Sequence, residues 1–311
     1  MADHFDMRNR RDFLKSGGLL SAAAVAASAS AVQELPQLRL GKYSISRLVC
    51  GSNMFGGGSH SSIFLDKRLK DYYTPERILK TLRRCDELGL NTWQTSGGMV
   101  ALNMKLAEQG IKMNCMVIAA AGETGAYGGQ PVGIDSYVKA GCIGIAHHGE
   151  HSDRLFKTGK IAEMNEYLKR VRDAGLLVGV STHMPAVVDI VESKGWDVDY
   201  YMTCVYERHR SADELKKLLG YVPLPVGEVY LREDPERMFR MIRQTKRPCF
   251  AFKILAAGRL SNTPESVETA FRDTFAAIKP GDGVIVGMYD EYSDQPLANA
   301  GYARKYGARP A

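Results

Sequence analysis

The sequence predicts an α/β protein, a (β/α)8 TIM barrel with an N-terminal β-hairpin. Short apolar runs of strand length alternate eight times with amphipathic stretches of helix length. The apolar runs are continuous, which is typical of parallel strands covered by helices. About 280 residues follow position 31, and this is a normal length for one such barrel.

The predicted elements follow one another in strand–helix pairs. Strands are expected at residues 46–51, 91–95, 115–120, 142–147, 177–181, 200–204, 248–252 and 283–287. Their helices are expected at residues 75–88, 100–109, 134–139, 161–174, 185–193, 212–219, 264–277 and 294–306. Helix ends carry the usual signals: Thr263-Pro264 places a cap before an N-terminal proline, and Gly175 follows a helix.

Three segments lie outside these pairs. Residues 38–46 predict a hairpin that closes the bottom of the barrel. The glycine-rich residues 51–60 lack the GxGxxG spacing of a phosphate loop, so we interpret them as a flexible lid or a plain linker. An additional segment, at about residues 225–242, separates the sixth helix from the seventh strand.

Residues 1–31 have the features of a twin-arginine export signal. Arg10 and Arg11 precede a short stretch that is rich in alanine and glycine and ends at the cleavage-type residues 29–31. This stretch is too short and too rich in alanine for a membrane anchor, which needs about 20 strongly apolar residues. We therefore expect recognition by the twin-arginine translocase and cleavage after Ala31. The barrel domain, residues 32–311, is then expected in the periplasm or outside the cell.

Composition excludes several classes of protein. The net charge of +6 is mild, and basic side chains are scattered among acidic ones, so we expect no nucleic-acid partner. Beyond the signal, we find no segment apolar enough to cross a membrane. The six cysteines are far apart without a CxxC pair, and four lie in apolar runs, which favours buried thiols over a disulfide framework.

Several stretches resemble the aldo-keto reductase family. Residues 38–42 and 45–51 are similar to that family's opening hairpin and first strand. Residues 159–163 and 175–181 are similar to its stretch between strands four and five, and residues 255–260 to the turn after strand seven. The resemblance covers most of residues 36–305. It implies a (β/α)8 barrel with the active site at the carboxyl ends of the strands, and NADP(H) as cofactor.

The resemblance implies a catalytic set of aspartate, tyrosine, lysine and histidine, and this sequence has the expected residue at one of the four positions. The aspartate position falls at Gln94 or Thr95, and residues 96–100 hold no tyrosine. Strand three, at residues 119–121, offers no lysine, whereas His147 or His148 meets the histidine position. Hydride transfer with tyrosine as the general acid therefore lacks its acid.

A histidine cluster follows the fourth and fifth predicted strands. His147, His148 and His151 follow the fourth strand, and His183 follows the fifth. Neighbouring strands lie about 4.8 Å apart, so His147, His148 and His183 could share a divalent metal ion. A carboxylate could complete the shell, from Glu123, Glu150 or Glu207, with Glu150 preferred. This ligand set suits Zn, Mn, Fe or Ni.

Alternatives to a metal site stay open. The cluster could form a metal-free acid/base and substrate-binding site, with His148 and His183 as catalytic residues. One of His147 and His148 could instead be structural and the other exposed. His183 precedes Pro185 and could cap the helix that starts there.

Lys253 ends the seventh apolar strand and is the third candidate catalytic residue. If it points into the barrel mouth, it can serve as a general acid, an electrostatic clamp or a Schiff-base amine. The alternative is a strand-end lysine that extends its charge into solvent.

The remaining candidates are substrate and cofactor contacts. Asn53, Gln94, Tyr206 and Tyr289 follow strands one, two, six and eight, and are predicted to bind substrate. Arg259 lies where such barrels bind phosphate and is the candidate contact for NADP(H).

Three functions are compatible with these observations. The first is an exported enzyme that acts on a sugar or polyhydroxylated carbonyl compound by His/Lys or metal-assisted proton transfer, as an isomerase, epimerase or lyase. The second is an NAD(P)-dependent oxidoreductase of the aldo-keto reductase type with an altered catalytic set. The third is a non-catalytic binding barrel.

Overall fold

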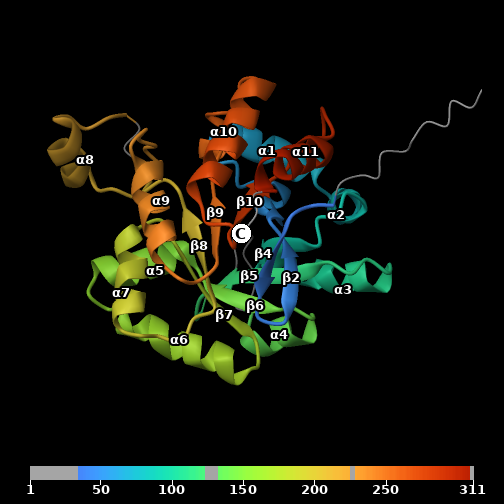
Figure 1. Cartoon of the computed structure of the whole chain (residues 1–311), viewed down its shortest axis with the longest axis horizontal. Coiled ribbons are helices and arrows are strands. Elements are labelled where there is room, and N and C mark those ends of the chain that lie inside the picture. The colour runs from blue at the N-terminus through green and yellow to red at the C-terminus, as the bar shows by residue number, and fades with distance from the viewer. Residues whose placement is uncertain (1–33, 123–131, 225–227, 309–311) are drawn as a thin grey trace, which may run out of the picture. The chain divides into compact units, whose positions relative to one another are not determined.

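Eight parallel strands close into a barrel in the computed structural model, which describes residues 34–122, 132–224 and 228–308. The strands are β3 Leu48–Gly51, β4 Thr92–Ser96, β5 Asn114–Ala119, β6 Gly144–His147, β7 Leu177–Thr182, β8 Tyr200–Cys204, β9 Cys249–Phe252 and β10 Gly283–Gly287. Each pairs with the next along the chain, and β10 pairs with β3 to complete the ring. Figure 1 shows helices arranged around these strands. The prediction of a (β/α)8 barrel is confirmed.

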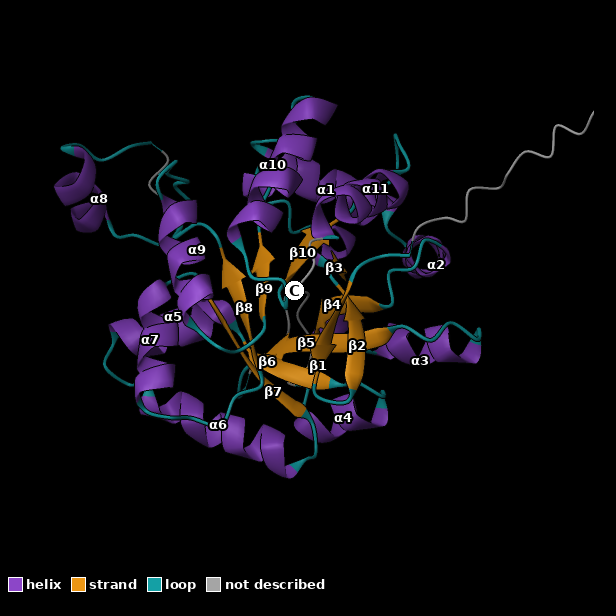
Figure 2. Ribbon diagram, in the orientation of Figure 1, coloured by secondary structure: helices purple, strands orange, loops and turns teal. Residues whose placement is uncertain are grey.

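The eight predicted helices are present, and their bounds agree with the prediction to within a residue. They are α2 Pro75–Glu87, α3 Ala101–Glu108, α4 Ile134–Lys139, α6 Ala162–Asp173, α7 Pro185–Ser193, α8 Ala212–Leu219, α10 Pro264–Ala277 and α11 Gln295–Gly307. Figure 2 shows them in purple around the orange strands. Side-chain caps support several starts, as at Thr263, whose hydroxyl accepts from the backbone N–H of Ser266.

Three further helices were not predicted as such. They are α1 Ile63–Tyr72, α5 Gly149–Lys157 and α9 Asp234–Gln244, the last lying in the predicted additional segment. Leu69 is the only fully buried residue of α1, and α5 buries Gly149, Ser152 and Asp153. Neither helix presents the apolar stripe on which helix prediction depends. Helix α1 begins after the glycine-rich residues 51–60, whose interpretation as a flexible lid or a plain linker stays a prediction.

The predicted hairpin closes the amino-terminal end of the barrel. Its strands are β1 Gln37–Leu40 and β2 Tyr43–Ser46, with Leu38 opposite Ile45. Leu38, Leu40 and Ile45 are buried and pack in one cluster with inward-facing residues of the barrel strands, which include Val49, Met116, Tyr200, Met202, Phe250 and Ile285. This apolar plug leaves the carboxyl end of the barrel as the end where polar side chains gather.

A second apolar cluster lies between the strands and the surrounding helices. All six cysteines are buried and free, as the sequence predicted. The predicted signal, residues 1–31, lies outside the described residues. Among the described helices, none is long and apolar enough to cross a membrane.

Candidate active site at the carboxyl end of the barrel

Helix α5 brings a carboxylate against the histidine that follows β7. His183 Nδ1 lies 2.7 Å from Asp153 Oδ2, and the His183 backbone N–H also donates to this carboxylate. Thr182 Oγ1 donates to Asp153 Oδ1 at 2.5 Å. Asp153 is 3% exposed and His183 4%. The buried Asp153 carboxylate accepts from three donors, one of them the Nδ1 side of the imidazole. This bond fixes the ring, and Nε2 is the imidazole nitrogen that remains for other interactions.

Burial and nearby charges indicate how Asp153 and His183 are protonated at neutral pH. Burial raises the pKa of the Asp153 carboxyl to about 6, so the group is still ionised at pH 7. Burial, reinforced by Arg208 and His209, lowers the pKa of His183 well below its usual range. A neutral His183 that donates Nδ1–H to an ionised Asp153 satisfies both residues. Its Nε2 then carries a lone pair and can accept a proton.

Gly149 allows this close approach of α5 to β7. It is the first residue of α5 and directly follows the N-cap residue His148. A Cβ atom at this position would lie 3.0 Å from Ser181 Oγ and 3.1 Å from His183 Cε1. A larger residue at position 149 would therefore displace the His183 ring.

Lys253 reaches the same mouth from β9. It directly follows the strand and adopts a left-handed backbone with φ of +59°. Burial lowers the pKa of its ammonium group to about 8, and the nearby Arg208 adds to this effect. The His183 ring packs against that of Phe252, the residue before Lys253, with 5.7 Å between ring centres, so the imidazole lies beside this end of β9.

Arg208 organises the acidic groups of the mouth. It is 4% exposed and donates to Glu150 at 2.6 Å and to Glu228. His60 Nδ1 lies 2.7 Å from Glu228, and Tyr230 donates to the same carboxylate at 3.1 Å. The Arg208 Nε atom is buried and has no hydrogen-bond partner among the described residues. One donor of this buried guanidinium therefore remains unused.

Sequence analysis missed five residues of this site: His60, Asp153, Arg208, His209 and Glu228. A signal existed for two of them, because residues 207–210 form a charged run directly after the buried strand β8. Asp153 gave no such signal, since it lies on an unpredicted helix rather than at a strand end.

The structure separates the predicted histidines. His147 Nδ1 lies 2.8 Å from Ser152 Oγ, and its ring packs against Tyr167 of α6, so it faces the helices. Burial lowers the pKa of His147 to about 3. His148 is partly exposed, and its backbone N–H donates to Ala119. The side chain that lies with Asp153 and His183 in the group of close ligand atoms is His209.

His183 does not cap the helix that follows it. The N-cap residue of α7 is Met184, and it forms no side-chain capping bond. The His183 imidazole bonds Asp153 instead. The alternative of a helix-capping histidine is therefore wrong.

Two predicted substrate contacts border the mouth on the β3 and β8 sides. Asn53 Nδ2 lies 3.3 Å from His60 Nε2. Tyr206 is buried, and its ring centre lies 5.1 Å from that of Tyr230. Both therefore contact the Arg208 and Glu228 cluster through one intermediate residue.

The other two predicted substrate contacts are occupied within the protein. Gln94 is buried and donates to the Thr95 carbonyl at 2.9 Å. The Tyr289 hydroxyl bonds Glu291, which in turn pairs with Arg68 at 2.5 Å. Their role in binding substrate stays a prediction.

One group of side chains among the described residues is close enough to share a metal ion. It consists of Asp153, His183 and His209, whose ligand atoms lie within 4.8 Å of one another. Glu150, a predicted ligand, lies 3.5 Å from His209 Nε2. Asp153 already accepts three hydrogen bonds, however, and Arg208 places a cation beside His183. The two histidines and the carboxylate are suitable ligands for a divalent ion, whereas the positive charge of Arg208 would repel one.

Arg259 is the predicted phosphate contact, and two other arginines near the loop after β10 are already paired, Arg68 with Glu291 and Arg84 with Asp294. Arg259 is exposed, stacks on Tyr230 at 4.1 Å, and bonds the carbonyls of His60 and Ala256. The loop after β10 is acidic, with residues Asp290, Glu291 and Asp294. These residues do not fit a clamp for the phosphates of NADP(H), which needs several positive or N–H donors.

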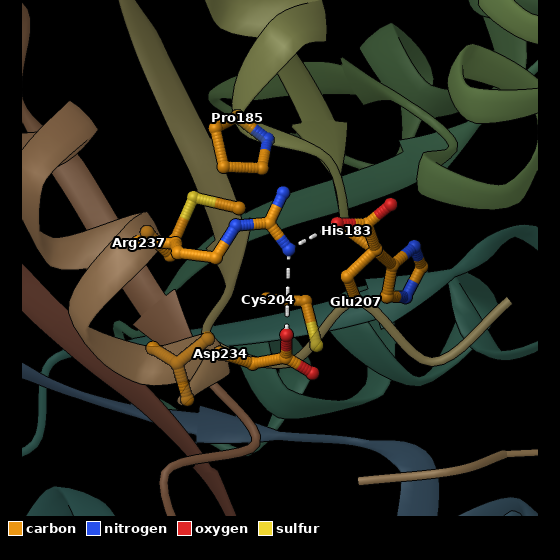
Figure 3. A pocket seen from close by; sticks show the side chains of 8 residues that line it. His183, Pro185, Cys204, Glu207, Asp234 and Arg237 are labelled. Carbon is orange, nitrogen blue, oxygen red and sulfur yellow. Dashed lines mark hydrogen bonds and ion pairs between the residues drawn. The ribbon is translucent and has the colours of Figure 1, made fainter. Parts of the chain in front are cut away.

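A small depression opens beside His183 on the side of α7 and α9. Figure 3 shows His183 together with Glu207, Asp234 and Arg237. The depression is shallow and has no enclosed space for a water molecule. Arg237 bridges Glu207 at 2.8 Å and Asp234 at 3.5 Å across it. These ion pairs fill the depression, so it is not the place where a substrate would bind.

Comparisons with known proteins agree with the fold. Neither a protein-family model nor a curated protein matches the sequence. A putative aldo-keto reductase from Pseudomonas aeruginosa is similar in structure, with a TM-score of 0.54 and 14% identity over 90% of this chain and 98% of that chain. A putative 2,5-diketo-D-gluconic acid reductase B is also similar, with a TM-score of 0.52 and 11% identity over 90% of this chain and 95% of that chain. For the glycerol dehydrogenase from Gluconobacter oxydans, the TM-score is 0.50 and the identity 13%, over 90% of this chain and 92% of that chain.

The chain therefore has an aldo-keto reductase-like barrel fold. Identities this low establish the architecture, and a fold by itself hosts many reactions. The catalytic chemistry has to be argued from the side chains at the mouth.

Proposed function

We propose that this protein is an enzyme that transfers a proton at the carbon beside the carbonyl group of a small polyhydroxylated compound. The observation that carries this proposal is the buried Asp153–His183 pair, which leaves His183 Nε2 as a base beside Lys253. An isomerase or epimerase needs this combination, a base for the C–H proton and a group that withdraws electrons from the carbonyl.

Each residue has a distinct part in such a reaction. His183 accepts the proton at Nε2 and becomes positively charged, and the Asp153 carboxylate stabilises that charge through Nδ1–H. Lys253 draws electron density from the carbonyl group as the C–H bond breaks. Other residues of the mouth, including Asn53, Arg208 and Arg259, offer donors for hydroxyl or carboxylate groups of the substrate. None of these roles requires a metal ion.

Hydrogen exchange tests this proposal directly. Dihydroxyacetone, D-glyceraldehyde and D-fructose are incubated with the protein in D2O, and loss of the α-proton signal is followed by NMR. We expect exchange above the buffer rate, and His183→Asn should reduce it by about 10²-fold or more. His147→Asn is the matched control, because His147 is also a buried strand-end histidine but faces the helices. Equal exchange in wild type and His183→Asn would refute the role of His183.

A second candidate is an NAD(P)-dependent oxidoreductase with an altered catalytic set. The structural comparisons favour it over proton transfer, because the similar proteins include aldo-keto reductases and a glycerol dehydrogenase. The acidic loop after β10 argues against it. Titration with NADPH and NADH, followed by the intrinsic fluorescence of Trp93 and Trp196, decides between the two. Binding in the micromolar range that Arg259→Ala weakens would support the oxidoreductase, and no binding at millimolar nucleotide would remove it.

We also propose that the twin-arginine translocase exports the protein, on the strength of Arg10 and Arg11. Changing both to lysine should abolish export, and cell fractionation with N-terminal sequencing of the exported form measures it. Arg8→Lys is the matched control. Export that survives the double change would contradict this route.

A further inference from the structure

Lys253 lies at a strained end of β9. Phe250 packs with the inner cluster, Ala251 with the outer one and Phe252 with both, so the alternation of a regular strand would point residue 253 toward the helices. The left-handed backbone ends the strand here, and Ala256 and Ala257 also have positive φ, +49° and +52°. Each such non-glycine residue costs about 1 kcal/mol or more, so the surrounding structure must hold this conformation.

Lys253 follows Phe252, whose ring packs against His183 of the mouth, and the Lys253 amine has no bonding partner among the described residues. The charged groups that act on Lys253 are Arg208, Glu228 and Glu150, all in the mouth, together with the Cys204 thiol. Lys253 Nζ forms no hydrogen bond or ion pair among the described residues. By contrast, Lys279 near the opposite end of the barrel donates to Asp282 and to the Ile242 carbonyl.

The neighbouring carboxylates are already neutralised by other residues. Glu150 and Glu228 both accept from Arg208, and Glu228 also bonds His60. An ammonium group at Lys253 is thus half-buried and has no carboxylate as an ion-pair partner among the described residues. The free amine, which is the nucleophilic form, is correspondingly favoured.

We propose that Lys253 is a covalent nucleophile that forms an imine with the carbonyl group of a small aldehyde or ketone. The Nζ lone pair forms a bond to the carbonyl carbon, and the C=O π pair moves to oxygen, which takes up a proton. The nitrogen loses a proton, its lone pair then forms the C=N bond, and the protonated hydroxyl leaves as water. Hydrolysis reverses these steps, so no oxidant or reductant is needed.

The imine explains how Lys253 can draw electrons from the carbonyl group. The protonated C=N group is a stronger electron sink than a hydrogen-bonded carbonyl, so the adjacent C–H proton becomes more acidic. His183 Nε2 is the base that removes this proton, giving an enamine whose reprotonation on carbon completes the transfer. This inference rests on the proposed function and names its covalent step.

Reductive trapping tests the proposal. The full chain is incubated with dihydroxyacetone and sodium cyanoborohydride, and the adduct is located by intact mass and peptide mapping. A parallel reaction with 2,4-pentanedione, which converts a reactive lysine into a near-ultraviolet-absorbing enaminone, needs no substrate specificity. We expect one adduct, on Lys253, in the wild type and in Lys194→Arg, the control for an exposed lysine. Lys253→Arg keeps the positive charge and should lose the adduct by at least about tenfold.

The mapping in the unmodified chain does not depend on whether the variant folds. Adducts spread over surface lysines, or none at Lys253 with either reagent, would overturn the proposal. Proton exchange in D2O, measured on the same samples, separates it from the proposed function. Exchange without an adduct refutes only the imine. The absence of both refutes both, and an adduct without exchange supports the imine and contradicts proton transfer.

Discussion

The two ends of the barrel each bury an arginine, and the two arginines differ in how many of their donors are used. Arg47, at the hairpin end, donates Nε to the Asp282 carbonyl, Nη1 to Gly307 and Nη2 to Lys279, at 2.6, 2.6 and 3.0 Å. Arg208, at the mouth, bonds two carboxylates and leaves Nε without a partner. Their exposures are similar, 2% and 4%, so burial alone does not distinguish their roles.

The difference shows which end of the barrel uses its buried hydrogen bonds to stabilise the fold. A buried donor without a partner costs about 1–3 kcal/mol, so a fold selected for stability alone would satisfy it. At the closed end, every donor nitrogen of the Arg47 guanidinium bonds a backbone carbonyl, and these bonds hold the start of β10 and the end of α11 in place. The mouth leaves Arg208 Nε and Lys253 Nζ unsatisfied, as expected of a site that completes its interactions with a ligand. The comparison predicts that changes at the mouth impair activity and changes at the closed end impair stability.

The largest effect is expected for Asp153→Asn. An amide cannot stabilise a positively charged His183, so proton exchange should fall by about 10²–10⁴-fold. The measurement is the NMR exchange rate, with the thermal unfolding midpoint as a check on folding. Asp189→Asn, at an exposed position of α7, is the control. Retained exchange in Asp153→Asn would mean that the carboxylate serves the structure and not the reaction.

Arg47→Met should have the largest effect on stability. The three carbonyls that Arg47 bonds would lose a partner in a buried region, which should lower the free energy of unfolding by about 3 kcal/mol. Urea denaturation measures the change. Arg39→Met is the control, because Arg39 is exposed and bonds one carbonyl, at 3.2 Å; its change should stay within about 0.5 kcal/mol. Equal changes in the two variants would contradict the structural role of Arg47.

The pH profile of kcat/KM should rise in two steps. Below about pH 6 the Asp153 carboxyl takes up a proton and no longer supports His183, so the rate should fall about tenfold per pH unit. Above that, the rate should rise again as Lys253 loses its proton near pH 8 and the amine becomes nucleophilic. A rate that declines above about pH 8 would instead show that Lys253 acts as an ammonium group. Initial rates between pH 4.5 and 9.5 in constant ionic strength distinguish the two.

His147→Asn should have the smallest effect. This change removes a hydrogen bond to Ser152 on the helix side of β6, which is worth about 1 kcal/mol, and touches nothing in the mouth. Proton exchange should stay within about twofold of the wild type. A loss of exchange comparable to that of His183→Asn, without loss of folding, would restore His147 to the site.

Prediction from the sequence succeeded where a single element carries the signal. The apolar runs located all eight strands to within two residues, and the N-cap and glycine signals located their helices. His183 and Lys253 were found because each directly follows a strand, and strand ends meet at the mouth of a barrel. Helix α5 and its Asp153 were missed because the buried face of α5 is made of small and polar residues.

The sequence by itself determined the barrel, its order of strands and the presence of His183 and Lys253 at its carboxyl end, because these follow from local periodicity and from the direction of parallel strands. Only the tertiary structure decided which polar side chains act together. His147 ends β6 and His183 follows β7, yet one bonds Ser152 and the other Asp153. His147 is the register partner of Val180, and His183 lies three positions further along the chain, an odd number that reverses the face on which its side chain leaves. The unpaired amine of Lys253 likewise results from a left-handed backbone and from Arg208, 45 positions earlier in the chain, which occupies the carboxylates that would otherwise pair with it.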